Sequence, residues 1–308
     1  MKERILITGA TSIIGKSLIR RLLSQNKSII TVSRNHDFSG ENPLLESFQW
    51  DLGLQTIHDV DHPLSSTKSD TNNKITTLVH CAPIWLLPKH LVELHSLGIK
   101  RVIAFSSTSI DSKSSSSNPV EQSIVQQLEE SEGFVKMFAL KANMQVTIFR
   151  PTMIYGYGQG LNLAFIAKMI QRFGFFPIVT AAKGLRRPVH ADDLAKAVCL
   201  ALPVPASFNK TYVLSGAKVM SYDEMVRAVF AALKRPIRIV KLPLFVYRAL
   251  ILLASKIAKM PMTATMAERM RENLDFDSMP AQEDFGYSPG SFLPNGIDDI
   301  LQKEEVKN

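Results

Sequence analysis

The chain has 308 residues, 45% of them hydrophobic, and a net charge of +8, with a sequence pI of about 9.4. This length suits one large α/β domain or a core domain with a smaller lobe, and the composition excludes a disordered or fibrous chain. The positive charge favours anionic partners such as nucleotides, phosphorylated sugars or an acidic membrane surface. We interpret the basic residues as dispersed and not interleaved with aromatic side chains, so we expect no nucleic-acid partner.

The few cysteines and histidines indicate a reducing compartment and no metal centre. Cys81 and Cys199 lie in apolar contexts and are expected to be reduced core residues rather than a disulfide framework. The seven histidines are scattered without metal-ligand spacing. Because the N-terminus leads directly into an apolar strand pattern, we expect no signal peptide and a cytoplasmic protein.

A glycine-rich turn follows the first apolar segment, Ile5–Ile7, which predicts a buried parallel strand. Gly9 permits a tight turn, and Gly15 lets the next helix, starting near Ser12 or Ile13, lie close on the strand. The first N–H groups of that helix and the positive end of its dipole form a site for a pyrophosphate. Ser12 stands where the dinucleotide fingerprint usually has a third glycine. A tight turn without a ligand has the same appearance, so the motif alone leaves both interpretations open.

Strand patterns then alternate with helical patterns through the first half, which is typical of βαβ units and a parallel sheet. The expected strands are Ser28–Ser33, Glu46–Leu52, Thr76–Cys81, Arg101–Ser107 and Gln145–Phe149. The expected helices are Ile13–Ser24, Pro88–Leu97, Pro119–Ala142 and Leu161–Phe173. Ser65–Lys74 is expected to be a surface loop, and the serine tract Ser112–Asn118 a mobile one. The sequence therefore predicts an α/β fold with a Rossmann-type doubly wound parallel sheet.

The second half breaks this alternation and predicts a smaller, mixed but mainly helical C-terminal lobe. Helices are expected at Ala191–Leu202 and Ser221–Leu233, the second with a Ser221–Glu224 capping box, and a strand at Lys210–Leu214. We place the dinucleotide-binding core at residues 1–177. The substrate-side lobe takes residues 178–308, with the chain crossing back to the core near residues 186–215.

One strongly apolar stretch, Leu242–Ile257, leaves two interpretations open. It is flanked by Lys241 and Lys259 and is too short and too charged for a transmembrane span. The first interpretation is a buried helix of the small lobe. The second is an interfacial helix that lies on anionic lipid and gives the protein a peripheral membrane contact.

Several motifs, in order and spacing, resemble one known family over nearly the whole chain. They are Thr8–Gly15, Val79–Ala82, Phe105–Ser109, Arg150–Gly156, Arg186–Ala195 and, near the C-terminus, Arg269–Asp277, Ala281 and Phe285–Pro289. These motifs resemble the extended and atypical short-chain dehydrogenase/reductase superfamily, in its branch of NAD-dependent epimerase/dehydratase proteins that act on nucleotide sugars. The resemblance implies a nicotinamide cofactor and a small-molecule nucleotide sugar as ligands.

The resemblance also implies which residues form the sites. Cofactor contacts are expected at Gly9, Thr11, Ser12, Ile13, Ile14, Gly15, Ser33, Arg34, Asp51, Leu52, Cys81, Ala82, Pro83, Ser106, Pro151 and Thr152. Arg186 falls where related epimerases hold the diphosphate of the sugar nucleotide, and Arg269 or Arg271 is a candidate for the same anion. Guanidinium groups suit phosphate oxygens because their N–H fork matches them. Asp193 is expected to cap a helix rather than to catalyse.

One departure from the family concerns the acid–base pair, a Tyr and a Lys four residues apart on the helix after the serine-rich strand. Counting back from Arg150 puts that pair near Ile124 and Leu128, and no tyrosine occurs between Gly98 and Arg150. Lys136 lies too late in the sequence for this role, and Lys113 too early. The dyad is therefore expected to be absent, and the candidate substitutes are Ser107, Thr108 and Tyr155.

The cofactor preference follows from the end of the second strand. An NAD site usually has an acidic residue there, whereas this chain has Ser33-Arg34 and no carboxylate until Asp37. An arginine suits a 2′-phosphate, so NADP is expected to bind more tightly than NAD. The sequence leaves open two functions: hydride chemistry on a nucleotide sugar or polysaccharide precursor, and a non-catalytic NADP(H)-binding regulatory or scaffold protein. It leaves the oligomeric state open as well.

Overall fold

The computed structural model describes residues 4–34, 42–54, 64, 74–158, 161–180, 182–249 and 264–301. Contacts divide the chain into two compact units. Unit 1 consists of Met1–Pro151, Ala191–Leu214 and Ser278–Ser288, and unit 2 of Thr152–His190, Ser215–Asp277 and Pro289–Asn308. The chain therefore first passes from unit 1 to unit 2 after Pro151, and not at the predicted residue 177. It comes early because the helix at Leu161–Phe173 buries its apolar face in the core of unit 2.

Unit 1 is built on a seven-stranded sheet in the order β11-β6-β5-β4-β1-β2-β3. Its strands are β1 (Arg4–Thr8), β2 (Ser28–Ser33), β3 (Leu45–Gln49), β4 (Ile75–His80), β5 (Arg101–Phe105), β6 (Gln145–Pro151) and β11 (Lys210–Leu214). All neighbouring strands in this sheet are parallel. The central strands read as continuous apolar runs because helices cover both faces of the sheet. This topology confirms the predicted Rossmann-type doubly wound sheet.

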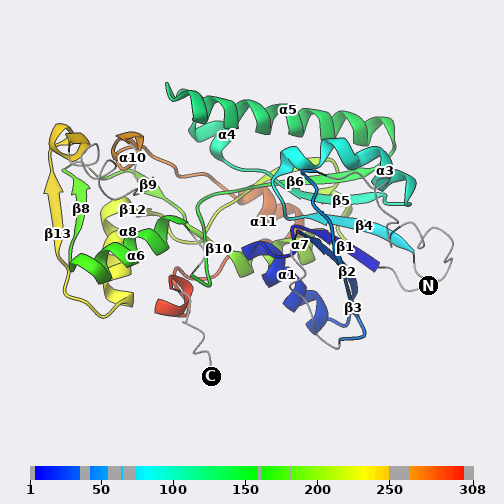
Figure 1. The fold of residues 1–308 in the computed structure, drawn as a ribbon, viewed down its shortest axis with the longest axis horizontal. Coiled ribbons are helices and arrows are strands. Elements are labelled where there is room, and N and C mark those ends of the chain that lie inside the picture. Colours follow the sequence, from blue (N-terminus) through cyan, green and yellow to red (C-terminus); the bar gives the residue numbers. More distant parts are fainter. Residues whose placement is uncertain are drawn as a thin grey trace. The chain divides into compact units, whose positions relative to one another are not determined.

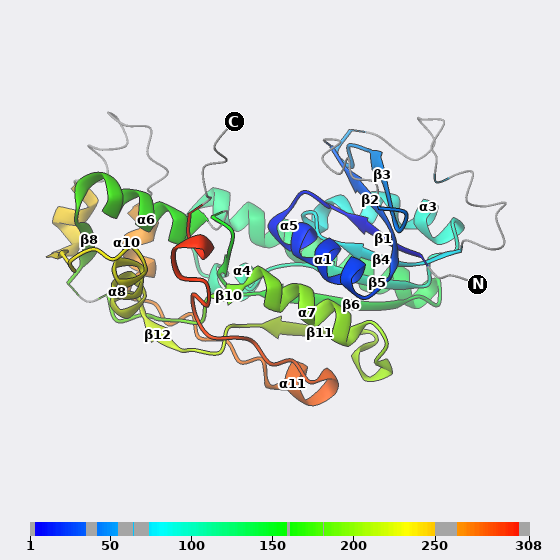
Figure 2. The ribbon, with the colours of Figure 1, turned by 90° about the horizontal axis from the view of Figure 1, so that it is seen from below.

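Helices cover both faces of that sheet (Figures 1 and 2). They are α1 (Ile13–Ser24) and α7 (Ala191–Ala201), which pack together on one face, and α3 (Leu91–Ser96) and α5 (Pro119–Lys141) on the other. Shorter elements are η2 (Ile84–Leu86), η3 (Pro88–His90), α4 (Ser109–Ser112), η4 (Pro205–Ser207) and α11 (Met279–Phe285). The helix at Pro119 begins as expected, because the Asn118 side chain accepts a hydrogen bond from the Val120 amide.

Some predicted elements of unit 1 differ at their ends. β3 stops at Gln49 because the chain then turns, and the Asp51 side chain accepts a turn hydrogen bond from the Gly53 amide. β5 stops at Phe105 because the chain turns into α4 at Ser109. The predicted helix Pro88–Leu97 divides into η3 and α3. Helix α7 starts at Ala191, so Asp193 lies in its first turn, beside the positive end of the dipole, and not at its cap.

Unit 2 combines helices with short strands that pair two by two, β10 with β7, β12 with β9 and β13 with β8. The strands are β7 (Ile154–Tyr155), β8 (Phe176–Val179), β9 (Leu185–Arg186), β10 (Val189–His190), β12 (Met220–Ser221) and β13 (Ile239–Leu242). The helices are α6 (Leu161–Phe173), α8 (Tyr222–Ala232), α10 (Ala264–Arg269) and the short η5 (Gly296–Asp299). The predicted capping box of Ser221 and Glu224 is present at the start of α8.

The apolar stretch Leu242–Ile257 is only partly described. Residues 244–249 are helical, but among them only Tyr247 is buried, while Phe245 is 74% exposed. The described part therefore buries one face and exposes the other, with Tyr247 in the core of unit 2 and Leu244 packed against that core. Residues 250–257, like residues 65–73 of the predicted surface loop, lie outside the described residues, so both interpretations of the stretch stay predictions. Within the described ranges, none of the helices has the length and apolar character that a membrane span needs.

Candidate functional site

The loops that follow the parallel strands meet at one edge of the unit 1 sheet. β1 lies between β4 and β2, so the strand order reverses between β1 and β4. In open α/β sheets, ligands bind beyond the carboxyl ends of the strands at such a point. The predicted cofactor residues of unit 1 all fall at this edge, after β1, β2, β3, β4, β5 and β6. The structure therefore brings together residues that are far apart in the sequence.

The glycine-rich turn after β1 has no room for larger side chains. Gly9 has a φ of +70°, and a Cβ there would lie 2.4 Å from the Ala82 amide nitrogen. A Cβ on Gly15 would lie 2.5 Å from the Gly9 carbonyl oxygen. Ser12 is the N-cap of α1, and its Oγ accepts the Gly15 amide at 3.0 Å. The amides of Ile13 and Ile14, the first two residues of the helix, have no acceptor within it and remain for an anion.

His80, at the end of β4, links this turn to the loop Cys81–Pro83. Its Nδ1 lies 2.7 Å from Thr8 Oγ1 and its Nε2 lies 3.1 Å from the Pro83 carbonyl oxygen. Only a protonated Nε2 can donate to a carbonyl, so Nδ1 accepts from the Thr8 hydroxyl. Burial of the imidazole lowers the pKa of His80 to about 4, which keeps it neutral in this arrangement. We did not predict from the sequence that His80 connects Thr8 to Pro83, although His80 lies in the motif Val79–Ala82.

The outer strands of the edge carry the residues predicted for the adenosine side of a dinucleotide. Ser33 is buried at the end of β2, and Arg34 is exposed beside it. The Leu52 carbonyl accepts from buried His90 at 3.0 Å, which fixes the chain after β3 next to Asp51. Residues 35–41, including Asp37, lie outside the described residues.

Hydroxyl groups cluster after β5, where the nicotinamide is expected. Ser107 Oγ donates to Ser109 Oγ at 3.0 Å and accepts the Ser109 amide at the same distance. The Thr108 hydroxyl donates to the Pro151 carbonyl oxygen at 3.1 Å and is buried, whereas Ser107 is half-buried. Ser107 is therefore the more accessible of the two predicted catalytic hydroxyls in unit 1.

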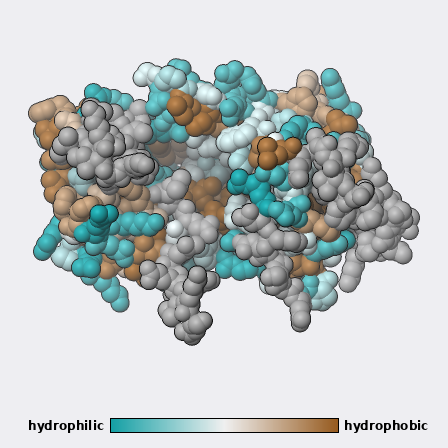
Figure 3. Space-filling view, in the orientation of Figure 1, coloured by the Kyte–Doolittle hydropathy of each residue, from teal (hydrophilic) through white to brown (hydrophobic). Residues whose placement is uncertain are grey.

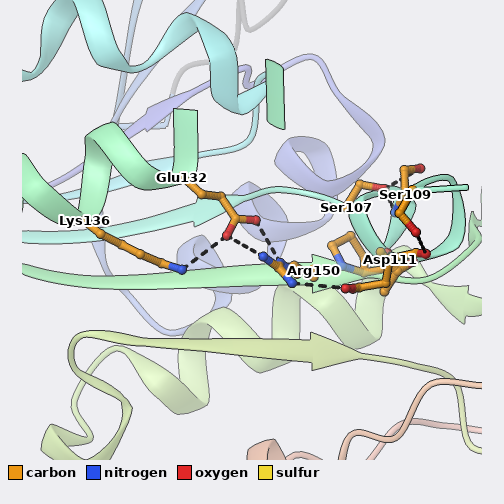
Figure 4. Close-up of polar contacts among 9 residues, drawn as sticks. Ser107, Ser109, Asp111, Glu132, Lys136 and Arg150 are labelled. Atoms are coloured by element: carbon orange, nitrogen blue, oxygen red, sulfur yellow. Dashed lines mark hydrogen bonds and ion pairs between the residues drawn. The ribbon is translucent and has the colours of Figure 1, made fainter. Parts of the chain in front are cut away.

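A charged network lies beside these hydroxyls (Figure 4). Arg150, on β6, donates to the two carboxylate oxygens of Glu132 at 2.9 and 2.8 Å, and it lies 3.5 Å from the carboxylate of Asp111 on α4. Lys136 lies 3.3 Å from Glu132 on the next turn of α5. Burial raises the pKa of Glu132, but Arg150, with Ser106 and Lys136, outweighs it and lowers the pKa overall. Glu132 is ionised, and the network ties α4, α5 and β6 together.

The sequence contained one indication of this network, because the carboxylate of Glu132 lies on the apolar face of α5. The prediction from the sequence did not use it. The same face carries Leu128 and Ile124, which lie four and eight residues before Glu132. Leu128 is 3% exposed, and half-buried Ile124 packs against the same core cluster. The helix face on which a Tyr–Lys pair was sought is thus apolar at both counted positions.

The predicted site residues of unit 2 are held by that unit. Thr152 Oγ1 donates to the Arg187 carbonyl oxygen at 2.5 Å. Tyr155 is 1% exposed, its ring packs edge-on against His190, and its hydroxyl accepts the Leu293 amide at 3.0 Å. These are the contacts of a packing residue, and the catalytic role of Tyr155 stays a prediction.

Arg186 is buried rather than on the surface. Its guanidinium donates to the carbonyl oxygens of Leu185 at 2.7 Å and Glu272 at 2.6 Å, and also to that of Arg269. Burial lowers the pKa of Arg186 to about 10, so it stays charged at neutral pH. Three of its five N–H groups are occupied in this way, which leaves Nε–H and one Nη2–H for any other acceptor. Arg269 is half-buried and Arg271 is exposed.

The two cysteines differ in burial. Cys81 is buried at the predicted cofactor edge, and burial raises the pKa of its thiol, so the group is an unreactive thiol at neutral pH. Cys199 on α7 is half-buried, not a core residue as expected, and both thiols are free. In the described part of the chain, no cluster of His, Cys, Asp or Glu has the makings of a metal site.

Comparisons with known proteins agree with this fold. A model of the NAD dependent epimerase/dehydratase family matches residues 5–215. A UDP-glucose 4-epimerase of Vibrio cholerae is 23% identical, over 98% of this chain and 95% of its own length.

Two solved structures are similar over nearly their whole length. The UDP-glucose 4-epimerase of Thermotoga maritima, solved with UDP-glucose, has a TM-score of 0.67 at 16% identity and 97% coverage of both chains. The UDP-glucuronic acid 4-epimerase of Bacillus cereus, solved with NAD, has a TM-score of 0.71 at 15% identity and the same 97% coverage. Such structural likeness shows a shared fold, while the family match takes in well over half of the chain. The chain therefore belongs to the NAD-dependent epimerase/dehydratase family.

Proposed function

We propose that this protein binds a nicotinamide dinucleotide at the carboxyl edge of the unit 1 sheet and recognises a nucleotide sugar. The observation that carries the proposal is the turn at Gly9–Gly15. Both glycines are required by close backbone contacts, and the turn leaves two helix amides for an anion. A turn that only connected β1 to α1 would not need Gly9 packed against the loop after β4.

The residues at this edge fit such a cofactor. Ile13 and Ile14 would donate to the pyrophosphate, and the side chain of Arg34 would meet a 2′-phosphate. The small residues Cys81 and Ala82 leave space along the ribose. When bound, the nicotinamide ring supplies hydride transfer to or from a carbon of the substrate. We propose that NADP(H) is preferred over NAD(H), because Arg34 occupies the place where an NAD site has a carboxylate.

The nucleotide sugar is the proposed substrate class, and its support comes from the relatives. The Thermotoga maritima epimerase was solved with UDP-glucose. In this chain, the charge that would meet a diphosphate comes from Arg186, with its two remaining N–H groups, and from Arg269 or Arg271. Arg186→Ala is expected to weaken UDP-sugar binding by about ten-fold or more, the loss of a charge-assisted hydrogen bond, and to leave cofactor affinity unchanged.

The proton transfer of an ordinary family member has no evident donor here. We propose that the Tyr–Lys pair is absent, because Ile124 and Leu128 occupy the helix face where it is expected. Ser107, Thr108 and Tyr155 are the remaining hydroxyls, and each is already engaged in a hydrogen bond. A positioned acid–base group contributes about 10²–10⁴-fold to a rate, so turnover of an alcohol or ketone should be correspondingly slow.

The apolar face of α5 favours a second candidate, a non-catalytic protein that binds NADP(H) and regulates or supports a partner. The experiment that separates the two candidates measures hydride transfer in the cofactor-loaded protein with UDP-glucose and UDP-glucuronic acid, after binding of each is established by calorimetry. Sugar-nucleotide binding with slow hydride transfer that Tyr155→Phe or Thr108→Val removes supports the enzyme. Cofactor binding without sugar-nucleotide binding supports the regulatory protein. Robust turnover that survives both substitutions together contradicts the proposed loss of the dyad.

A further inference from the structure

The net charge of the chain is concentrated in one segment. Eight of the 36 basic residues lie between Met225 and Ala267, and this stretch contains no Asp or Glu. Outside it, the remaining 28 basic residues balance all 28 acidic residues. The whole excess of +8 therefore belongs to 43 consecutive residues, which corrects our interpretation of the basic residues as dispersed.

The described part of this segment displays its cations on the surface of unit 2. All five basic residues between positions 234 and 249 are exposed: Lys234, Arg235, Arg238, Lys241 and Arg248. Lys241 lies 3.6 Å from Asp223, and Arg248 pairs with Glu268. Among the described residues, no carboxylate pairs with Lys234, Arg235 or Arg238. These three cations carry an uncompensated positive charge at the start of β13.

Apolar side chains are exposed among the same cations. Ile237 is 50% exposed, Val240 is 41% exposed and Phe245 is 74% exposed. The turn from α6 into β8 adds Phe173 and Phe175, which are 47% and 40% exposed.

Strand β8, which follows these two phenylalanines, is joined directly to the basic segment. The Phe176 amide at the start of β8 donates to the Arg238 carbonyl oxygen at 3.0 Å, which sets the two exposed phenylalanines beside β13. We name this set of exposed residues at 172–175 and 234–248 the basic–apolar face. Figure 3 shows hydrophobic and hydrophilic residues side by side along the edge where β13 and β8 lie in Figure 1.

We propose that the basic–apolar face docks onto the surface of an anionic lipid bilayer. Basic residues near such a surface gain from the negative potential of the lipid headgroups, and apolar side chains between them enter the boundary with the acyl chains. The long stems of Lys and Arg reach from the apolar layer to the headgroups. An acidic nucleic acid would use the cations but would gain nothing from exposed Ile237 and Val240.

The sequence beyond the described residues has the same character. Residues 250–254 are all apolar, and Lys256 and Lys259 follow, again without an acidic residue. The proposed partner therefore matches the charge and the hydropathy of the whole segment. The proposal is independent of the nucleotide site, which lies in unit 1.

The test is co-sedimentation of the full chain with vesicles. One set contains phosphatidylcholine alone, and the other contains phosphatidylcholine and phosphatidylglycerol in equal parts. We expect binding to the anionic vesicles only, weakened by salt. Each surface cation adds roughly five-fold to such binding, so K234Q/R235Q/R238Q should weaken it by about a hundred-fold. I237S/F245S should also weaken it, and that loss should persist at low salt.

The control variants change equally exposed residues of unit 1. K27Q/K100Q/K141Q removes the same net charge, and L140S replaces a side chain that is 85% exposed on α5. Both controls should bind nearly as tightly as the unmodified chain, and circular dichroism should show every variant folded. The proposal is overturned if the chain ignores anionic vesicles, if it binds phosphatidylcholine equally well, or if the two triple variants behave alike. Capture of RNA or polyglutamate without vesicle binding would also overturn it.

Discussion

At the scale of single residues, His80 holds the candidate cofactor edge together through two hydrogen bonds that require a neutral imidazole. Its pKa falls from an ordinary 6.5 to about 4 because the ring is buried. The unfolded chain therefore binds a proton at His80 over this pH range while the native chain does not. The stability that His80 contributes is present above about pH 6.5 and is lost as the pH falls toward 4.

The resulting prediction concerns the pH dependence of unfolding. The free energy of unfolding should fall by on the order of 3 kcal/mol between pH 6.5 and 4 through this residue. Urea denaturation of the unmodified chain and of His80→Gln, at matched pH values, isolates the contribution as their difference. That difference should shrink as the pH falls. A difference that stays constant with pH would contradict the burial of His80 in a neutral form. The same pH dependence in the exposed control His95→Gln would show that the effect does not arise from His80.

The residues of the candidate site were predictable to different degrees for physical reasons. Gly9, Ser12 and Gly15 follow a pattern set by local backbone geometry, so the sequence alone predicts the turn and its N-cap. The Glu132–Arg150 pair joins residues 18 positions apart, and nothing local to either residue shows that the two meet. Arg186 was predicted as an anion ligand from the resemblance, but its three carbonyl contacts depend on the path of residues 269–272.

At the scale of elements, α5 is a long helix with an exposed glycine in its interior. Gly133 has no atom within 4 Å of the place where a Cβ would stand, and its backbone is helical. Gly133→Ala should therefore stabilise the protein by about 0.5–1 kcal/mol, because alanine loses less conformational freedom on folding. Gly174 also has open space, but its φ of +74° disfavours any L side chain.

The substitutions Gly133→Ala and Gly174→Ala give a matched comparison of melting temperatures by thermal unfolding. Gly133→Ala should raise the melting temperature, and Gly174→Ala should lower it despite the equal room for a methyl group. If both substitutions raise it, backbone conformation at Gly174 is not the constraint; if both lower it, the interior of α5 is not a regular exposed helix.

Elements were predictable where one periodicity dominates. The helices α1, α5 and α6 and the strands β2 and β11 match their predicted ranges to within one residue, because each buries a single apolar face or lies between two helical layers. The short strands of unit 2 were not predicted, since two-residue partners such as β9 and β12 leave no pattern and are set by tertiary contacts. The crossing at Pro151 was missed because β6 and β7 are almost continuous in the sequence.

At the scale of the whole molecule, the chain has two regions of distinct chemistry. Unit 1 has a strand edge with backbone donors that we propose for a dinucleotide, and unit 2 has a basic–apolar face. The family match covers the first of these regions, and the charge excess defines the second. The central claim about function is that the Gly9–Gly15 turn of unit 1 binds a nicotinamide dinucleotide even though the acid–base pair is not evident.

Calorimetric titration measures the affinity of NADPH and of NADH for the unmodified chain and for the Ser12→Asp variant, and it tests this claim most directly. Aspartate also caps helices well, so α1 should stay intact, but its carboxylate would stand where the pyrophosphate binds. We predict that the unmodified chain binds NADPH more tightly than NADH. Ser12→Asp should weaken both by at least about ten-fold through charge repulsion. Asn118→Asp, which places the same charge at the N-cap of α5, should leave both affinities unchanged. No binding by the unmodified chain, or equal binding by a folded Ser12→Asp variant, would contradict the account.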